Sequence, residues 1–257
     1  MPHATVHGQV LFYFERPAPA STIPPLLLIH GAGGTSLDWP PHLRRLPGVT
    51  VYALDLPGHG QSGLQGRDTI TAYTADVRGL LDVLKLDKTI LIGHSMGAAI
   101  ALQCTLDAPE RVAGLVVVSG GARMRVNPAL LDAALNDTSQ VVEFVMAYGY
   151  GPHTDRTLKQ FGEKGLRATA PEVLHGDYVA CNGFDVRGRL GEIATPVLIV
   201  GGGADQMMPV KLSAELAAGL LDADLRRIEE AGHMLPVEFP ERLAEIVSGW
   251  LQERWRP

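Results

Sequence analysis

Short apolar runs separated by segments with helical spacing are the feature that most constrains the fold of this 257-residue chain. Such runs, bounded by Gly and Pro, are typical of strands buried on both faces of a parallel sheet. Parallel strands need a crossover connection, usually a helix, so the alternation predicts an α/β domain whose mostly parallel central sheet is flanked by helices. The expected strands are 9–15, 26–29, 49–54, 89–92, 114–118 and 196–200, with a weaker strand at 224–228 toward an edge.

Four segments between or after these runs have apolar residues at helical spacing, and they are residues 69–86, 95–107, 209–221 and 239–254. Pro209 and Pro240 stand near the starts of the last two, where proline is tolerated. Residues 121–190 interrupt the alternation, because they suit helices and contain no clear buried strand.

We interpret residues 121–190 as a helical cap inserted into a core domain of residues 1–120 and 191–257. The alternative is a set of ordinary crossover helices, but about 70 residues is long for one crossover.

Composition excludes several functional classes. The chain has 22 Lys and Arg against 28 Asp and Glu, a formal net charge of −6. Nucleic-acid surfaces and polybasic membrane faces need clustered positive charge, so we expect neither a nucleic-acid nor a membrane partner.

The two cysteines, Cys104 and Cys181, lack CxxC spacing, and no metal-ligand motif is present. No apolar run approaches the roughly 18 residues of a membrane span, and the first sixteen residues lack signal-peptide features, so we expect a cytoplasmic protein.

The segment 89–102, TILIGHSMGAAIAL, is the strongest chemical signal. A buried strand leads directly into a G-x-S-x-G motif at residues 93–97, and a helix rich in small residues follows. This turn leaves a serine, Ser95, in a strained conformation with its hydroxyl exposed. Glycines at positions 93 and 97 relieve the crowding, and the helix start directs N–H groups toward developing negative charge.

The chain resembles the α/β-hydrolase fold superfamily over nearly its whole length. Four further segments carry the resemblance in the expected order: 30–34 (HGAGG), 55–62 (DLPGHGQS), 201–209 (GGGADQMMP) and 231–234 (AGHM). The resemblance implies a serine hydrolase, similar to carboxylesterases, with a helical cap.

The resemblance also implies a catalytic triad in the order Ser95, Asp205, His233. His233 lies in a Gly-flanked loop after the last strand, where the family places its histidine. Its rival His94 neighbours the serine but diverges from it, and His30 and His59 belong to segments that are usually structural. The strand that precedes an alternative acid position ends in Val-Ser-Gly-Gly at 118–121, which holds no carboxylate. The alternative for Asp205 is a loop residue or a helix cap.

An oxyanion hole needs two N–H donors. We assign the backbone N–H groups of Met96, which follows the nucleophile, and Ala32, in the glycine loop. Gly31 or Gly33 could replace Ala32, because the sequence does not fix the register of this loop.

Aromatic and sulfur-containing residues in the cap suggest an apolar pocket wall, although such residues are as often simple packing. They are Met124, Phe144, Met146, Tyr148 and Tyr150. The glycines at 201–203 suggest a dinucleotide-binding turn, but Gln206 stands where the last glycine of that motif belongs. We therefore expect neither a nucleotide cofactor nor a metal.

The leading hypothesis is a carboxylesterase that cleaves small to medium esters through an acyl-enzyme on Ser95, with water as the second substrate. The same triad would serve a carbon–carbon bond hydrolase, an enol-lactonase, a thioesterase or a cofactor-free perhydrolase. A hypothesis of another class is a small-molecule-binding or signalling module with slow turnover. The sequence leaves the oligomeric state open.

Overall fold

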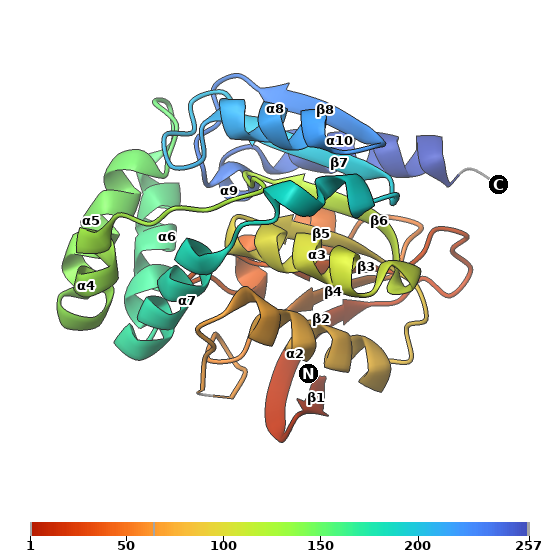
Figure 1. Ribbon diagram of the computed structural model, residues 1–257, viewed down its shortest axis with the longest axis horizontal. Helices are drawn as coiled ribbons and strands as arrows, with labels where there is room; N and C mark the ends of the chain where they lie inside the picture. The colour runs from red at the N-terminus through yellow and green to blue at the C-terminus, as the bar shows by residue number, and fades with distance from the viewer. Residues whose placement is uncertain (1, 64, 256–257) are drawn as a thin grey trace.

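A computed structural model describes residues 2–63 and 65–255 and contains a single eight-stranded sheet in the order β1-β2-β4-β3-β5-β6-β7-β8 (Figure 1). The six strands from β4 to β8 in this order are parallel to one another, whereas β2 pairs antiparallel with both β1 and β4. The strands are β1 (His3–Val6), β2 (Gln9–Arg16), β3 (Leu26–Ile29), β4 (Val51–Leu54), β5 (Thr89–His94), β6 (Val112–Val118), β7 (Val197–Gly202) and β8 (Ala223–Ile228).

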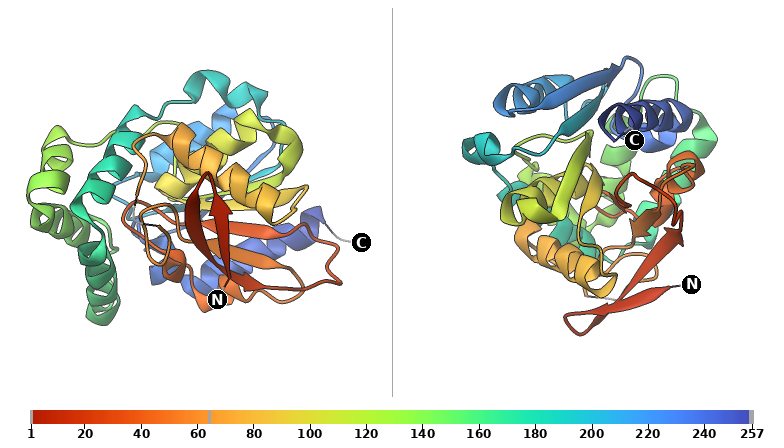
Figure 2. Two further views of the ribbon diagram at one scale, coloured as in Figure 1. Left: turned by 90° about the horizontal axis from the view of Figure 1, so that it is seen from below. Right: turned by 90° about the vertical axis from the view of Figure 1, so that its right-hand side faces the viewer.

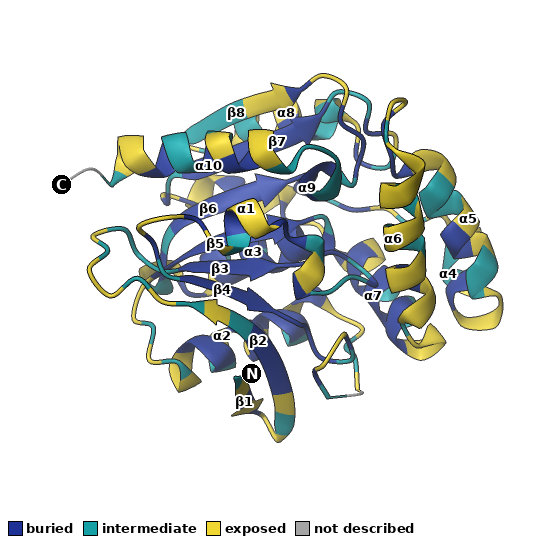
Figure 3. Cartoon of the chain, turned by 180° about the vertical axis from the view of Figure 1, so that it is seen from behind, coloured by how far each residue is buried: buried dark blue, intermediate teal, exposed yellow. Residues whose placement is uncertain are grey.

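Helices cover both faces of the sheet, which confirms the predicted α/β-hydrolase architecture. Helices α2 (Ile70–Val83), α3 (Met96–Asp107) and α8 (Val210–Gly219) lie on the face toward the viewer in Figure 1. On the opposite face, which Figure 3 shows, lie α1 (Pro41–Arg44), α9 (Leu235–Glu238) and α10 (Pro240–Arg254). Each face has its own apolar cluster, because side chains of the buried strands point alternately to the two sides.

The chain between β6 and β7 forms four α-helices that lie together at one end of the sheet (Figures 1 and 2). Their bounds are α4 (Pro128–Asn136), α5 (Thr138–Tyr148), α6 (Arg156–Ala168) and α7 (Pro171–Gly183), and a 3₁₀ turn, η3 (Arg187–Glu192), leads into β7. They share a small apolar cluster separate from the two sheet clusters. The boundaries of a cap domain stay a prediction, but the helical character of this segment agrees with the sequence pattern.

Two further 3₁₀ turns complete the described structure, η1 (Ser36–Asp38) and η2 (Pro109–Arg111). No helix among residues 2–63 and 65–255 is long and apolar enough to span a bilayer.

The main element missing from the sequence prediction is β1, which forms a hairpin with β2 at the edge of the sheet (Figure 2). The two-residue turn consists of His7 and Gly8, with φ of 48° and 78°. Positive φ at both central positions is the geometry that matches the twist of a tight hairpin. A four-residue strand such as β1 depends on its partner, so its own sequence carries little signal.

Candidate active site

Ser95 lies at the junction between β5 and α3, in the turn predicted from the G-x-S-x-G motif. Its φ is 51°, a left-handed value that is costly for a residue with a side chain. The Ser95 N–H donates to the carbonyl oxygen of Val118 on the neighbouring strand β6, 3.0 Å away, which ties the turn to the sheet. The side chain is partly exposed, so the strained backbone presents the hydroxyl rather than burying it.

The two glycines of the motif allow α3 to pack directly on strand backbone. A Cβ at Gly97 would lie 2.1 Å from the carbonyl oxygen of Ile29 in β3, and a Cβ at Gly93 would lie 2.2 Å from the carbonyl oxygen of Gly97. Real Cβ atoms do not approach backbone this closely, so a side chain at either position would push the helix away from the sheet.

Three side chains from distant parts of the sequence form a hydrogen-bonded line. The His233 Nε2 atom lies 2.9 Å from the Ser95 hydroxyl oxygen, and the His233 Nδ1 atom lies 3.0 Å from Oδ2 of Asp205. Asp205 follows β7, and His233 follows β8. Since parallel strands end at the same edge of the sheet, the loops after β5, β7 and β8 converge there.

The other carboxylate oxygen of Asp205 accepts the N–H groups of Met207 and Met208, at 2.9 and 2.8 Å. These two bonds leave Oδ2 directed at the imidazole of His233. Both side chains are almost fully buried, at 0% exposure for Asp205 and 5% for His233. The arrangement therefore holds one ring nitrogen against a carboxylate and directs the other at the serine.

His94 contributes a contact that sequence reasoning did not assign. Its Nε2 atom lies 2.8 Å from the main-chain carbonyl oxygen of His233, so it donates to that oxygen and fixes the His233 backbone. Burial lowers the pKa of His94 to about 3, so this donor is a neutral imidazole.

The glycine loop after β3 passes beside the serine. A Cβ at Gly31 would lie 3.3 Å from Cβ of Ser95. Residues 31–34 form a tight turn closed by the Gly34 N–H, which donates to the Gly31 carbonyl oxygen at 3.1 Å. Within this turn the Gly33 N–H is already occupied, because it donates to Oδ2 of Asp177 at 2.8 Å. The Met96 N–H belongs to the first turn of α3 and has no partner within the helix.

A cavity of about 320 Å³ opens above Ser95 and His233. Of the five pocket residues named from the sequence, Met124, Phe144 and Tyr150 line it. Met146 and Tyr148 lie outside it. Met146 packs within the helical cluster, while Tyr148 is 45% exposed and contacts the ring of Phe144. Met146 is two residues from Phe144 and therefore lies on the opposite side of α5. Tyr148 is on the same side as Phe144 but one turn further along, at the last residue of the helix.

Two buried histidines in the neighbouring loops have opposite charge states. The rings of His30 and His59 are 4.9 Å apart. His30 donates from Nδ1 to the Gly31 carbonyl oxygen and accepts the Leu56 N–H at Nε2, which requires a neutral ring. Burial, reinforced by the charge on His59, lowers the pKa of His30 to about 3.

His59 faces an acceptor at each ring nitrogen. Its Nδ1 atom lies 3.0 Å from the Pro57 carbonyl oxygen, and its Nε2 atom lies 2.9 Å from Oδ2 of Asp177. Donation from both nitrogens requires the imidazolium form. Burial alone would lower the pKa of His59. The charge of Asp177 and the hydrogen bonds to Asp177 and to the Pro57 carbonyl oxygen, with a smaller effect of Asp55, together outweigh burial and raise this pKa above its ordinary value. A buried ion pair therefore joins the loop after β4 to α7.

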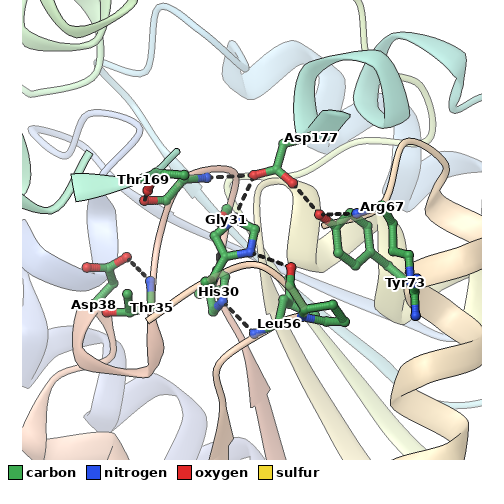
Figure 4. A network of polar contacts seen from close by, with 12 residues as sticks. His30, Gly31, Thr35, Asp38, Leu56, Arg67, Tyr73, Thr169 and Asp177 are labelled. Atoms are coloured by element: carbon green, nitrogen blue, oxygen red, sulfur yellow. Dashed lines mark hydrogen bonds and ion pairs between the residues drawn. The ribbon is translucent and has the colours of Figure 1, made fainter. Parts of the chain in front are cut away.

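Sequence reasoning missed Asp177 (Figure 4). The one available signal is its position in α7, where it falls on the same helix face as four apolar residues: Val173, Leu174, Ala180 and Cys181. A carboxylate on an apolar face needs a buried partner. That partner, His59, lies 118 positions away in the sequence, and no pattern near either residue identifies it.

No group of three or more His, Cys, Asp or Glu side chains in the described part of the chain is arranged to hold a metal ion.

Comparison with known proteins identifies the relatives of this chain. A family model described as "Alpha/beta hydrolase family" matches residues 26–246. The "Dihydrolipoyllysine-residue acetyltransferase component of acetoin cleaving system" of Pseudomonas putida is 32% identical, over 97% of this chain and 69% of that protein. The "Putative carbamate hydrolase RutD" of Variovorax paradoxus is 29% identical, over 90% of this chain and 88% of that protein.

Among solved structures, the enol-lactonase from Burkholderia xenovorans LB400 superposes with a TM-score of 0.91. The match covers 98% of this chain and 100% of that one, at 22% sequence identity. At this identity the likeness shows the fold alone.

The contact between α3 and β3 leads to a prediction about stability. Replacing Gly97 with Ala places a methyl group against the Ile29 carbonyl oxygen, and we expect the free energy of unfolding to fall by about 1–3 kcal/mol or more. The control is Gly249→Ala in α10, where a Cβ meets nothing within 4 Å. There the higher helix propensity of Ala should stabilise by up to about 1 kcal/mol. Urea denaturation measures both, and equal effects would contradict the proposed packing constraint.

The His59–Asp177 pair leads to a prediction about pH. A histidine whose pKa is raised on folding contributes stability that is fully present below its unfolded pKa, about 6.5, and is lost as pH rises through the folded value. The difference in unfolding free energy between the wild type and Asp177→Asn should therefore be largest below about pH 6.5 and shrink as the pH rises. Denaturant titrations at several pH values measure it. A difference that grows with pH would show that His59 is neutral in the folded protein.

Proposed function

We propose that this chain, which belongs to the alpha/beta hydrolase family, is a serine hydrolase. Its proposed substrates are carboxylic esters of small to medium size. The observation that carries the proposal is the line from Ser95 through His233 to Asp205, with contacts of 2.9 and 3.0 Å. A serine hydroxyl becomes a nucleophile when an adjacent base takes its proton and a third group orients that base.

In the proposed mechanism the Ser95 oxygen attacks the carbonyl carbon of the ester while the Nε2 atom of His233 takes the hydroxyl proton. Asp205 holds the opposite nitrogen as a donor and stabilises the imidazolium that forms. The imidazolium then gives its proton to the leaving alcohol, and an acyl-enzyme remains. Water, deprotonated by the same imidazole, attacks the acyl carbon and releases the acid.

The tetrahedral intermediates carry negative charge on the former carbonyl oxygen, which two N–H donors would stabilise. We assign these donors to Met96, at the start of α3, and Ala32, in the glycine loop. Two observations favour Ala32 within its turn. The neighbouring Gly33 N–H is engaged by Asp177, and the Gly34 N–H is engaged by Gly31.

The cavity supports an ester with an apolar part, since Met124, Phe144 and Leu166 line it and its volume of about 320 Å³ is at the lower end for ligand pockets. We propose that helices α4 to α7 act as the cap that encloses this part of the substrate. The relative described as a carbamate hydrolase makes carbamates a natural second series to assay, because acyl transfer from a carbamate uses the same groups.

Replacing Ser95 with Ala should lower kcat for p-nitrophenyl esters by roughly 10³- to 10⁶-fold, since the nucleophile is lost while the cavity remains. The measurement is turnover of a series of graded acyl length, together with labelling by a fluorophosphonate probe. The control Ser248→Ala lies on α10, outside the cavity, and should leave both readouts unchanged. Wild-type turnover by Ser95→Ala would overturn the assignment. Absence of labelling and turnover in the wild type would favour a binding module.

A further inference from the structure

Gly33 is held at both its main-chain polar atoms by residues from the helices between β6 and β7. Its N–H donates to Oδ2 of Asp177 in α7 at 2.8 Å. Its carbonyl oxygen accepts the hydroxyl of Thr169, in the connection from α6 to α7, at 3.0 Å. Figure 4 shows Asp177 and Thr169 together above the loop that begins at Gly31. The oxyanion loop, defined as residues 31–34, is thus clamped by a part of the chain more than a hundred residues away.

The clamp acts at the point where the oxyanion loop has an alternative conformation. Gly34 donates to Gly31, so Ala32 and Gly33 are the central residues of a β-turn, and Gly33 has φ of 64°. Positive φ at the third position is typical of a type II turn, which differs from type I by rotation of the central peptide. That rotation would exchange the positions of the Gly33 N–H and the Ala32 carbonyl oxygen.

In the rotated turn the carbonyl oxygen of Ala32 would face the carboxylate of Asp177 in place of a donor. An acceptor facing a buried carboxylate is unfavourable, whereas the observed N–H···O⁻ bond is charge-assisted and about twice as strong as a neutral one. Asp177 therefore selects one of the two turns, and with it the direction of the peptide next to the Ala32 N–H.

The carboxylate of Asp177 is surrounded by hydrogen-bond donors. Oδ2 receives the His59 imidazolium at 2.9 Å, and Oδ1 receives the Tyr73 hydroxyl at 2.6 Å. Asp177 and His59 are both fully buried, so each compensates the other's charge. The oxygen that holds Gly33 is shielded from bulk solvent, since the Asp177 side chain is 0% exposed.

We propose that Asp177 is a positioning residue for the oxyanion hole, so that the docking of α7 on the core and the orientation of the oxyanion loop are a single event. The catalytic consequence rests on the proposed esterase function, whereas the structural consequence for the loop does not.

If Asp177 only anchors α7, a different result is expected. A substitution at Tyr73 distinguishes this anchoring role from the proposed positioning role. Tyr73 donates to Oδ1, while Gly33 and His59 contact Oδ2. Tyr73→Phe therefore weakens the anchoring of α7 but leaves the Gly33 contact in place. Thr169→Val, which is nearly isosteric, removes the contact to the Gly33 carbonyl oxygen and leaves the ion pair untouched.

The first experiment is amide hydrogen exchange in the full-length protein, followed in peptides that cover residues 31–36. Asp177→Asn and Thr169→Val should both increase exchange at Gly33 and Gly34. Tyr73→Phe should not, even where it lowers the thermal midpoint as much as Thr169→Val does. Unchanged exchange in Asp177→Asn and Thr169→Val, or an equal increase in Tyr73→Phe, would overturn the proposal whatever the activity. If Asp177→Asn does not fold, Thr169→Val carries this comparison alone.

The second experiment measures kcat and KM for a p-nitrophenyl ester, and the inhibition constant of a trifluoromethyl ketone, which forms an oxyanion on Ser95. Asp177→Asn should lower kcat by about 10- to 100-fold with little change in KM, and should weaken the ketone by a similar factor. Thr169→Val should also lower kcat and weaken the ketone, but by smaller factors. Tyr73→Phe should retain the wild-type kcat. Loss of activity in all three variants in proportion to stability would favour simple anchoring. A wild type that neither turns over esters nor reacts with fluorophosphonate would instead contradict the proposed function, and the exchange experiment would still decide the role of Asp177.

Discussion

The close contact of α3 with the backbone of β3 and β5 is the constraint on which the rest of the site depends. Only glycine at positions 93 and 97 permits it, because any Cβ there would meet main-chain atoms at little more than 2 Å. The contact places Ser95 in a left-handed conformation at the carboxyl edge of the sheet. Once the serine is fixed there, the loops after β7 and β8 need only reach the same edge to bring a carboxylate and an imidazole into line.

Charge placement around this site follows from the count of donors and acceptors. His30 and His94 each serve a carbonyl oxygen in a buried setting and are neutral, with pKa values of about 3. His59 meets two acceptors and a carboxylate and has a raised pKa. Three buried histidines of the same intrinsic basicity thus differ in charge because of what their ring nitrogens face.

The sequence predicted the parts of this structure that local pattern encodes. The predicted strands 26–29 and 196–200 are continuous apolar runs, and the structure has strands at Leu26–Ile29 and Val197–Gly202. Buried parallel strands carry that signal regardless of their partners. Of the three side chains named from motif and order, His233 lies within hydrogen-bonding distance of both Ser95 and Asp205. The residues of the cavity wall were harder to predict, because the position of α5 against the cavity depends on tertiary packing. Phe144 and Tyr148 lie on the same side of α5, one turn apart, and only Phe144 lines the cavity.

The pairing of Asp177 with His59 could not be predicted for a related reason, since nothing local to either residue specifies the other.

The pairing of these two residues also has a consequence for protein engineering. A protein engineer who wants to change the substrate range of such an enzyme could exchange the helices over the cavity. Here those helices bring a counter-ion for the core as well as part of the cavity wall. A chimera that imports four foreign helices without a carboxylate at the position of Asp177 would leave a buried cation unneutralised. It would also remove the contact that holds the oxyanion loop. A change in its activity would then report the loss of this contact rather than a new substrate specificity.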